Sequence, residues 1–375
     1  AMILGSDSHT RYGALGTLAV GEGGPELVKQ LLRQTYDVRR PEVIAVYLKG
    51  KLRKGVGPQD VALALIRATF ASGFVKNKIL EFIGPGIAGL SMDYRIGIDV
   101  MTTETTCLSS VWETDDKTRE YLKEHGREEG YREMKVAQPA YYDGAVTIDL
   151  SRVEPMIALP FHPSNAYTIR EFLADPIPLL KAAEEQGRKI KGDDSFTLTD
   201  KVRDGKVYVT QGIIAGCAGG GYENVAEAAE ILRGKSVGTG EFSLSVYPAS
   251  QPVYKALTDA GYTSVLMEAG AVVKTAFCGP CFGAGDVPAN NGLSVRHTTR
   301  NFENREGSRP GQGQLAAVAL MDARSIAATA ANGGVLTSAL DYAYNKRIKK
   351  YKFDSKIYAN RVYRGIGKTD PAEEL

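Results

Sequence analysis

Short apolar runs alternate with segments of helical periodicity along most of the chain. The run from Val43 to Leu48 is almost continuously apolar, which is typical of a strand buried on both faces. From Pro58 to Phe70 apolar residues recur at helical spacing, and a proline suits the first turn of a helix. Similar runs predict strands at Met2–Leu4, Val207–Ile214 and Phe242–Tyr247. This alternation predicts parallel sheets joined by helices, and therefore an α/β fold.

Two later segments also predict helices. From Glu223 to Leu232 the spacing is helical, and Asn224 is a candidate cap. The loop Gly219–Gly221 precedes this helix, so its free backbone N–H groups favour an anion. The alanine-rich stretch from Gln314 to Ala331 predicts a further helix, which a Gly-Gly pair would end.

Composition describes an ordinary globular chain with material for several subdomains. The 375 residues are 43% hydrophobic and 24% charged, with a formal charge of +2, so neither disorder nor a polyanionic partner is expected. We expect the remainder of a first α/β subdomain at 1–40, a second at 41–160, a third with the cysteines at 161–345, and a basic linker at 346–375. Pro160–Pro163 interrupts the pattern and marks the expected junction.

Lysines, arginines and tyrosines are interleaved from residue 345 to 364. Such a mixture can stack on a nucleic acid strand, but it more often lies along the acidic surface of its own protein. We therefore expect a linker there, and neither a nucleic acid nor a membrane partner.

Three of the four cysteines lie on glycine-rich turns, at Cys217, Cys278 and Cys281. A CxxC pair with a third thiolate suits an iron–sulfur cluster that keeps one iron unligated by protein. An open iron can act as a Lewis acid toward a hydroxyl and a carboxylate. Zinc is an alternative, with His297 as the only nearby histidine for a fourth donor, and a redox thiol pair is another. The low cysteine count predicts a reducing compartment, and so a cytoplasmic protein.

Five ordered stretches together resemble the aconitase superfamily, including the large subunit of isopropylmalate isomerase. In chain order they are Gly5–Thr10 with the following glycine-rich segment, Glu81–Gly86 leading to Leu90–Arg95 and Glu104, the Cys217 loop, Cys278-Gly279-Pro280-Cys281, and Arg300–Arg305. The resemblance implies an aconitase-like iron–sulfur core of three-layer α/β/α subdomains with mainly parallel sheets. It also implies a hydratase or isomerase acting on a hydroxy di- or tricarboxylate.

The resemblance assigns roles to individual residues. Cys217, Cys278 and Cys281 match the ligands of a [4Fe-4S] cluster, which is oxygen-labile and can be absent from purified protein. Ser8 joins Arg300 and Arg305 as a substrate-binding residue, since guanidinium groups grip carboxylates bidentately. Asp7, His9 and Glu104 match catalytic positions, where a Glu–His pair would orient the imidazole for proton transfer.

The chain enters the first motif at once, and the swivel domain of the family is not within its 375 residues. We therefore expect a core fragment that lacks the N-terminal start and the C-terminal swivel domain, and that does not turn over alone. The swivel domain of the full-length chain and a small hydroxy carboxylate are the expected partners.

Three departures from the family pattern bear on catalysis. Asp99-Val100 stand where the family has Cys-Asn, Ala218-Gly219-Gly220 where it has Thr-Asn-Ser, and Thr299 where it has Asn before Arg300. Each replacement removes an amide that would orient the cluster or its ligands. An atypical substrate, or a non-catalytic sensor or binding module, is therefore an alternative, beside the zinc and thiol-redox interpretations.

Overall fold

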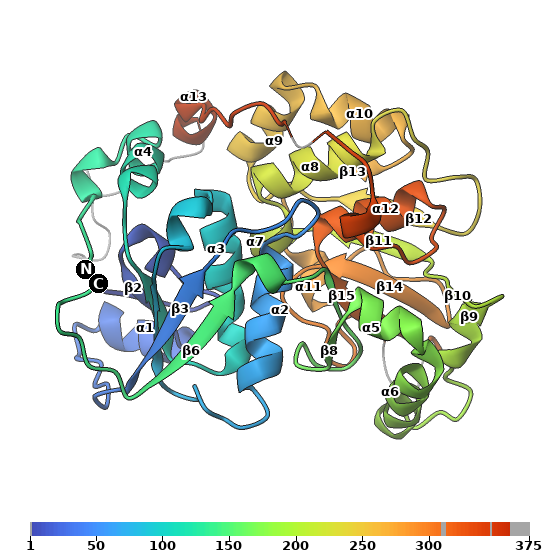
Figure 1. Cartoon of the computed structure of the whole chain (residues 1–375), viewed down its shortest axis with the longest axis horizontal. Coiled ribbons are helices and arrows are strands. Elements are labelled where there is room, and N and C mark those ends of the chain that lie inside the picture. The colour runs from blue at the N-terminus through green and yellow to red at the C-terminus, as the bar shows by residue number, and fades with distance from the viewer. Residues whose placement is uncertain (1, 309–312, 346, 361–375) are drawn as a thin grey trace, which may run out of the picture.

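The computed structural model describes residues 2–308, 313–345 and 347–360 (Figure 1). Its strands are β1 Met2–Gly5, β2 Leu18–Gly21, β3 Val43–Lys49, β4 Ile79–Ile83, β5 Ser109–Trp112, β6 Gly144–Asp149, β7 Met156–Ala158, β8 Ala166–Thr168, β9 Val202–Arg203, β10 Lys206–Val207, β11 Gln211–Ile214, β12 Ser243–Val246, β13 Val272–Val273, β14 Gly292–His297 and β15 Ala316–Met321. Its α-helices are α1 Gly24–Leu31, α2 Pro58–Thr69, α3 Met92–Met101, α4 Asp116–Glu124, α5 Ile169–Ala174, α6 Pro176–Lys191, α7 Gly216–Gly219, α8 Tyr222–Leu232, α9 Gln251–Asp259, α10 Tyr262–Glu268, α11 Gly279–Phe282, α12 Ala323–Ala331 and α13 Ser355–Ala359.

Two sheets form the framework of the described chain. The first has four parallel strands in the order β5-β4-β3-β6. The second has seven strands in the order β13-β12-β11-β14-β15-β7-β8, with β7 and β8 antiparallel to their neighbours. Figure 1 shows α8, α9 and α10 in the upper part of the lobe that holds the larger sheet, and α5 and α6 in its lower part, near β8. Residues of all five helices share one apolar core with this sheet. The predicted α/β class with mainly parallel sheets is confirmed.

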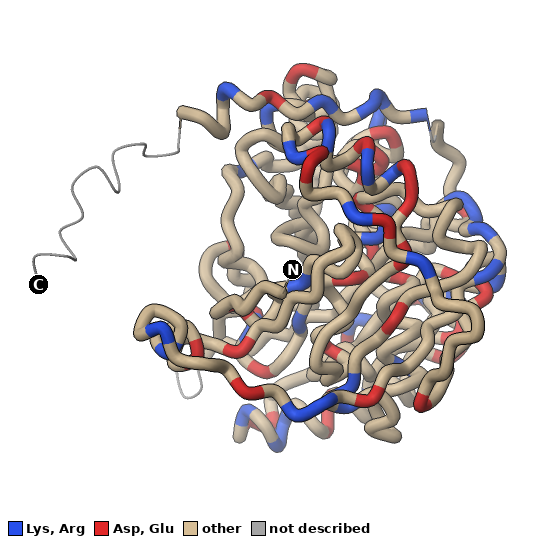
Figure 2. The backbone as a smooth tube through the Cα atoms, turned by 90° about the vertical axis from the view of Figure 1, so that its left-hand side faces the viewer, with Lys and Arg blue, Asp and Glu red and all other residues tan. Residues whose placement is uncertain are grey.

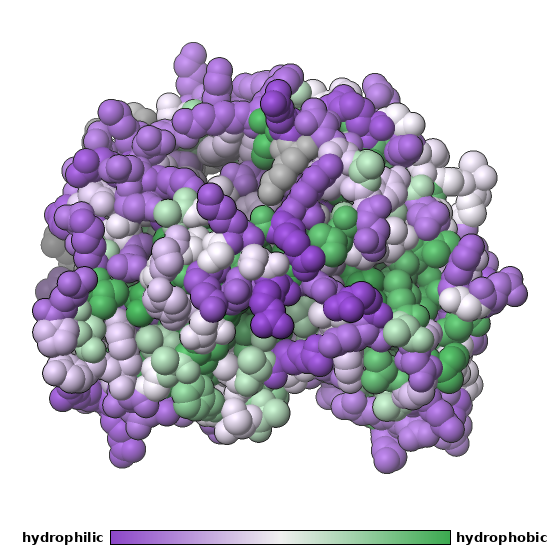
Figure 3. Space-filling view, in the orientation of Figure 1, coloured by the Kyte–Doolittle hydropathy of each residue, from purple (hydrophilic) through white to green (hydrophobic). Residues whose placement is uncertain are grey.

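Strand β3 lies between β4 and β6, and its burial follows from its apolar sequence. Ile44, Val46 and Leu48 have no exposed surface, and on the other face Ala45 is buried whereas Tyr47 is exposed. Helix α2 follows at the predicted place, and a proline begins its first turn. A groove of about 560 Å³ separates α2 from β6, and the surface there is partly apolar in Figure 3.

The helix predicted from Gln314 to Ala331 is wrong in its first half. Residues Ala316–Met321 instead form β15, which is buried along its whole length between β14 and β7. Helix α12 begins only after Asp322, whose side chain accepts the N–H of Arg324. Alanine is the best helix former, but intrinsic propensity is weak beside tertiary packing, so the place between two strands decides the structure of this apolar run.

Three other boundaries differ from the expectations. The strand predicted from Val207 to Ile214 is split between β10 and β11. Helix α8 begins after Gly221, so Asn224 lies inside it and is not its cap. The chain passes from the smaller sheet to the larger one between β6 and β7, whereas residue 160 lies inside the β7–β8 hairpin. The division into subdomains at 40 and 160 stays a prediction.

The described part of the basic tail crosses the surface of its own protein. The N–H of Lys349 donates to the Tyr262 hydroxyl at 2.8 Å, and the Tyr351 ring lies 5.3 Å from that of Tyr222. Figure 2 shows basic and acidic residues interspersed over the face turned to the viewer. Residue 346 and residues 361–375, which include the tyrosine at 363, lie outside the described residues. No described helix has the length and apolar character that crossing a membrane requires.

Candidate functional site

The loop after β1 presents a histidine that is nearly buried. The carboxylate of Asp7 accepts the backbone N–H of His9 at 2.7 Å, which shapes the turn. The hydroxyl of Thr103 donates to the carbonyl of Ser8 at 2.9 Å and ties the loop to the segment after α3. The His9 Nε2 lies 2.7 Å from Glu104 Oε1, so the predicted pair is formed.

Glu104 joins the histidine to an arginine from a distant part of the chain. It lies in a 3₁₀ turn, Thr102–Thr105, with 2% of its side chain exposed. The same Oε1 also accepts the Nε–H of Arg300 at 2.8 Å. A buried carboxylate is stable only when it is paired and hydrogen-bonded, and these two partners satisfy that need. Glu104 therefore fixes the orientation of the His9 imidazole and of the Arg300 guanidinium.

Phe302 organises the two arginines that the sequence singled out. The guanidinium of Arg300 lies 5.4 Å from the Phe302 ring, and that of Arg305 lies 6.0 Å from it. The His162 ring stacks on Phe302 at 5.2 Å. Phe302 lies inside the Arg300–Arg305 motif, but its role could not be predicted from the sequence.

The Cys217 loop is held through its backbone. Cys217 stands in the short helix α7, where a side chain at Gly219 would lie 2.1 Å from the carbonyl oxygen of His297. Only glycine allows this approach, so the departure from the family at that position has a packing cause. The side-chain amide of Asn224, in α8, donates to the Ala218 carbonyl at 3.0 Å and holds the turn in place.

The other two cysteines lie at the two ends of the first turn of α11. Cys278 precedes the helix, and the N–H of Cys281 donates to the Cys278 carbonyl at 3.0 Å. Buried Arg296 donates to the Pro280 carbonyl at 2.6 Å, which fixes the turn from the sheet side. Lys274 pairs with Asp286 at 2.5 Å and so closes the loop that carries both cysteines.

The three thiols lie close enough to affect one another, but they do so unequally. A hydrogen bond with Cys278, reinforced by Thr299, lowers the pKa of Cys281 to about 5. The same bond, with burial, raises the pKa of Cys278. Cys217 keeps accessible surface, yet the protein around its thiol displaces water and raises its pKa to about 12, and the charge of Cys281 adds to this. The charge of Asp7 acts on Cys217 and Cys278, so the first loop and both cysteine loops share one site.

The remaining departures have physical causes in the structure. Asp99 is buried and accepts hydrogen bonds from Ser110 and Trp112, so it braces α3 against β5. Val100 and Ala218 belong to one buried apolar cluster, which places two of the departures in contact with a shared core. Thr299 keeps a hydrogen-bonding group at its position, because its hydroxyl oxygen lies 2.8 Å from the sulfur of Cys281.

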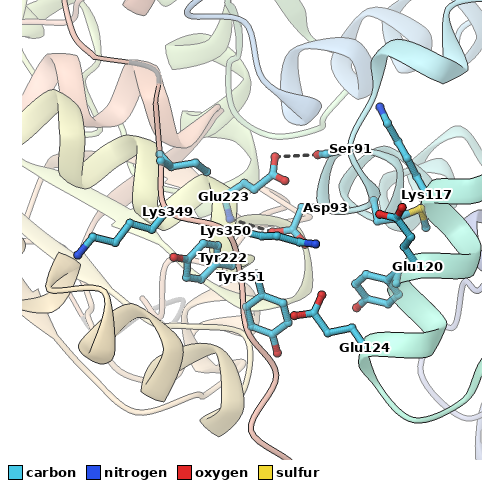
Figure 4. A pocket seen from close by; sticks show the side chains of 13 residues that line it. Ser91, Asp93, Lys117, Glu120, Glu124, Tyr222, Glu223, Lys349, Lys350 and Tyr351 are labelled. Carbon is cyan, nitrogen blue, oxygen red and sulfur yellow. Dashed lines mark hydrogen bonds between the residues drawn. The ribbon is translucent and has the colours of Figure 1, made fainter.

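A pair of carboxylates lies at the junction between α3 and α8, in a pocket of about 300 Å³ (Figure 4). Asp93 accepts the N–H of Glu223 at 2.8 Å, and the Ser91 hydroxyl donates to Glu223 at 2.7 Å. Burial raises the pKa of both acids, that of Glu223 to about 7, and the charge of Asp93 adds to the rise at Glu223.

The structure offers less to zinc than to a multi-iron cluster. Within the described ranges, no group of three or more His, Cys, Asp or Glu side chains is arranged to hold one metal ion. The Nδ1 of His297 accepts the N–H of Ala323 at 2.9 Å, and burial lowers the pKa of this histidine to about 4. A [4Fe-4S] cluster instead binds each thiolate through a different iron, so three thiolates suffice and no fourth protein donor is required. Three neighbouring thiols on two loops, one already favoured as thiolate, fit that donor set.

The fold and the site define an α/β protein that brings two cysteine loops together with a histidine–carboxylate–arginine group. A model of the aconitase family (aconitate hydratase) matches residues 1–328. The chain therefore belongs to the aconitase family, a family of hydro-lyases.

Curated relatives extend over most of the chain. It is 32% identical over 327 residues to the 3-isopropylmalate dehydratase large subunit of Acetivibrio thermocellus, covering 87% of this chain and 70% of that protein. It is 32% identical over 308 residues to the 2,3-dimethylmalate dehydratase large subunit of Eubacterium barkeri, covering 82% of this chain and 65% of that protein. The holo form of aconitase X from Thermococcus kodakaraensis aligns with a TM-score of 0.41 and 15% identity, over 79% of this chain and 61% of that chain.

Proposed function

We propose that this chain is the cluster-binding part of a hydro-lyase that acts on a small hydroxy di- or tricarboxylate. The observation that carries the proposal is the meeting of Cys217, Cys278 and Cys281 with the linked His9–Glu104–Arg300 group. Membership of the aconitase family and the dehydratase names of the relatives support the reaction class.

Cys217, Cys278 and Cys281 would hold a [4Fe-4S] cluster. When bound, the cluster supplies a Lewis acid at its open iron, which weakens the bond to a substrate hydroxyl. Three protein ligands would leave one iron of such a cluster without a ligand from these two loops.

The arginines would bind and orient the substrate. Arg300 donates its Nε–H to Glu104, and this buried partner orients the guanidinium. The outer edge of the planar, always charged group is left for the substrate. Arg305 also lies near the Phe302 ring, and its guanidinium is 3.5 Å from the carbonyl oxygen of Cys281. Two fixed cations side by side suit a substrate with more than one carboxylate.

The histidine would hold or move a proton at its imidazole. Glu104 binds Nε2, so it sets which nitrogen carries the proton and leaves Nδ1 facing the Asp7–Ser8 loop. Proton transfer by a positioned imidazole is effective near neutral pH because its ordinary pKa lies close to it. A swivel domain or partner polypeptide would complete the site, and cytoplasmic localisation stays a prediction.

Anaerobic reconstitution with iron and sulfide tests the proposal. We expect about four irons and four sulfides per chain, as in a [4Fe-4S] cluster. The loaded protein, joined to its remaining domain or partner, should then dehydrate members of a hydroxy acid panel. A protein that retains only zinc would contradict the cluster, and one that loads iron but turns over no acid would favour the sensor alternative.

A further inference from the structure

Thr299 makes a contact that the proposed reaction does not use. Its hydroxyl oxygen lies 2.8 Å from the sulfur of Cys281, and 1% of its surface is exposed. The residue follows β14 and immediately precedes Arg300, whose Nε binds Glu104. One short segment therefore sets the position of a sulfur and of a substrate-facing guanidinium.

The chemistry fixes the direction of this hydrogen bond once Cys281 is a ligand. A thiolate has no proton to give, so the threonine hydroxyl must be the donor. A buried hydroxyl needs a partner, and in the described ranges the Cys281 sulfur is the one found for Thr299. The bond is thus expected to persist, and to be charge-assisted, when the sulfur is bound to iron.

The contact is specific to one of the three sulfurs. The hydrogen bonds that act on Cys217 come from backbone N–H groups of its own turn, and Cys278 interacts with Cys281. Thr299 acts on Cys281 through both its side chain and its backbone. Charge spread from this sulfur onto a hydroxyl stabilises the more negative form of an attached cluster most.

We propose that Thr299 is a positioning residue that donates a hydrogen bond to the Cys281 thiolate and thereby raises the reduction potential of the bound cluster. The inference rests on the proposed function, since it requires a cluster at these cysteines. One electron enters the cluster on reduction, and in the experiment below dithionite supplies it.

A redox titration of the reconstituted chain, followed by electron paramagnetic resonance, tests the inference. Thr299→Val keeps the volume but removes the hydroxyl, and its cluster should have a lower midpoint potential than wild type. Thr299→Ser restores the hydroxyl and should restore the potential. Iron and sulfide content, measured for each variant, should match that of wild type.

Thr298→Val is the matched control. Thr298 is equally buried and adjacent, but its hydroxyl finds no hydrogen-bond partner in the described residues. Its cluster should have the wild-type potential, and an equal shift in both valine variants would overturn the inference. Should Thr299→Val fail to fold, Thr299→Ala replaces it with the same expectation.

The outcomes separate the two proposals. If wild-type protein takes up no cluster, that result contradicts the proposed function and this inference as well. Wild-type protein that loads normally while Thr299→Val and Thr299→Ala share its potential sinks the inference alone. Loss of the cluster from both variants would also overturn it, because Thr299 would then retain the cluster and not tune it.

Discussion

The two loops that carry the cysteines hold their sulfurs by different means. The loop around α11 acts on its sulfurs through side chains, and the pKa of Cys281 is lowered to about 5 by hydrogen bonds from Cys278 and Thr299. The loop around α7 is fixed through its backbone, and burial raises the pKa of Cys217 to about 12. The α11 loop is thus prepared to supply one thiolate, at Cys281, whereas Cys278 and Cys217 would each release a proton as metal binds.

Replacing one ligand from each loop should give the largest effects. In the reconstituted chain, Cys217→Ser and Cys281→Ser should each lower retained iron by about tenfold or more, because a ligand to the cluster is lost. Iron and sulfide assays after gel filtration measure this. Cys107→Ser is the control, since that buried thiol donates to the Thr102 carbonyl outside the two loops. Retention of full iron content by Cys217→Ser would remove that residue from the ligand set.

Asn224→Ala should loosen the backbone-held loop. The change removes the hydrogen bond to Ala218 and one acceptor of the buried Arg324 guanidinium. We expect a loss of about 1–3 kcal/mol in the free energy of unfolding, measured in urea. Asn332→Ala is the control, because the hydrogen bond from the Asn332 side-chain amide to Thr337 is exposed. Its loss should lower the free energy of unfolding by no more than about 0.5 kcal/mol. Equal losses of unfolding free energy in the two variants would show that the hydrogen bond from Asn224 does not stabilise the loop.

Glu223→Gln should change how the stability of the protein depends on pH, because Glu223 belongs to the carboxylate pair at the junction between α3 and α8. The groups that face Glu223 are Asp93 and Ser91 on the α3 side, with Glu227 and Arg324 on the other. The folded protein keeps the Glu223 proton up to about pH 7, whereas the ordinary value is 4.5. Stability from this group is therefore complete below the ordinary value and is lost as the pH rises through 7.

Glutamine removes this loss, so the variant should gain on wild type between pH 5 and pH 8 by on the order of 1–3 kcal/mol. Thermal unfolding at both pH values measures the difference. Glu120→Gln lines the same pocket but is exposed, and it should show no such gain. A difference between Glu223→Gln and wild type that does not change with pH would contradict the assignment.

Lys274→Met should give the smallest effect. The ion pair with Asp286 closes the α11 loop, but 34% of the lysine side chain is exposed. Partly exposed pairs contribute about 0–1 kcal/mol, so a loss within this range is expected in urea unfolding. A larger loss would show that the Lys274–Asp286 ion pair also determines how the loop folds.

The motifs carried most of what the sequence could predict. The family motifs paired His9 with Glu104, and the structure forms that pair. The contact of Arg300 with the same carboxylate was not predicted, since the sequence assigned Arg300 only to the substrate. The strand at β3 could also be predicted, because its apolar residues are nearly continuous.

The rest depended on tertiary context. The segment at β15 has the composition of a helix, and only its neighbours β14 and β7 decide otherwise. Asn224 matches a cap in sequence, but the fold directs its amide to Ala218. The replacements at Val100 and Ala218 each looked like a lost polar group, whereas together they form part of one apolar cluster. Such compensation involves residues far apart in the chain, so single positions do not reveal it.

The shared oxygen of Glu104 has a consequence for thermodynamic linkage. An anionic ligand that draws Arg300 toward itself would weaken the contact between this guanidinium and Glu104, because one guanidinium would serve both partners. Ligand binding and the Glu104–Arg300 contact would therefore oppose each other, and the coupling must be equal in both directions. Calorimetry of anion binding to wild type and to Glu104→Gln would measure this coupling.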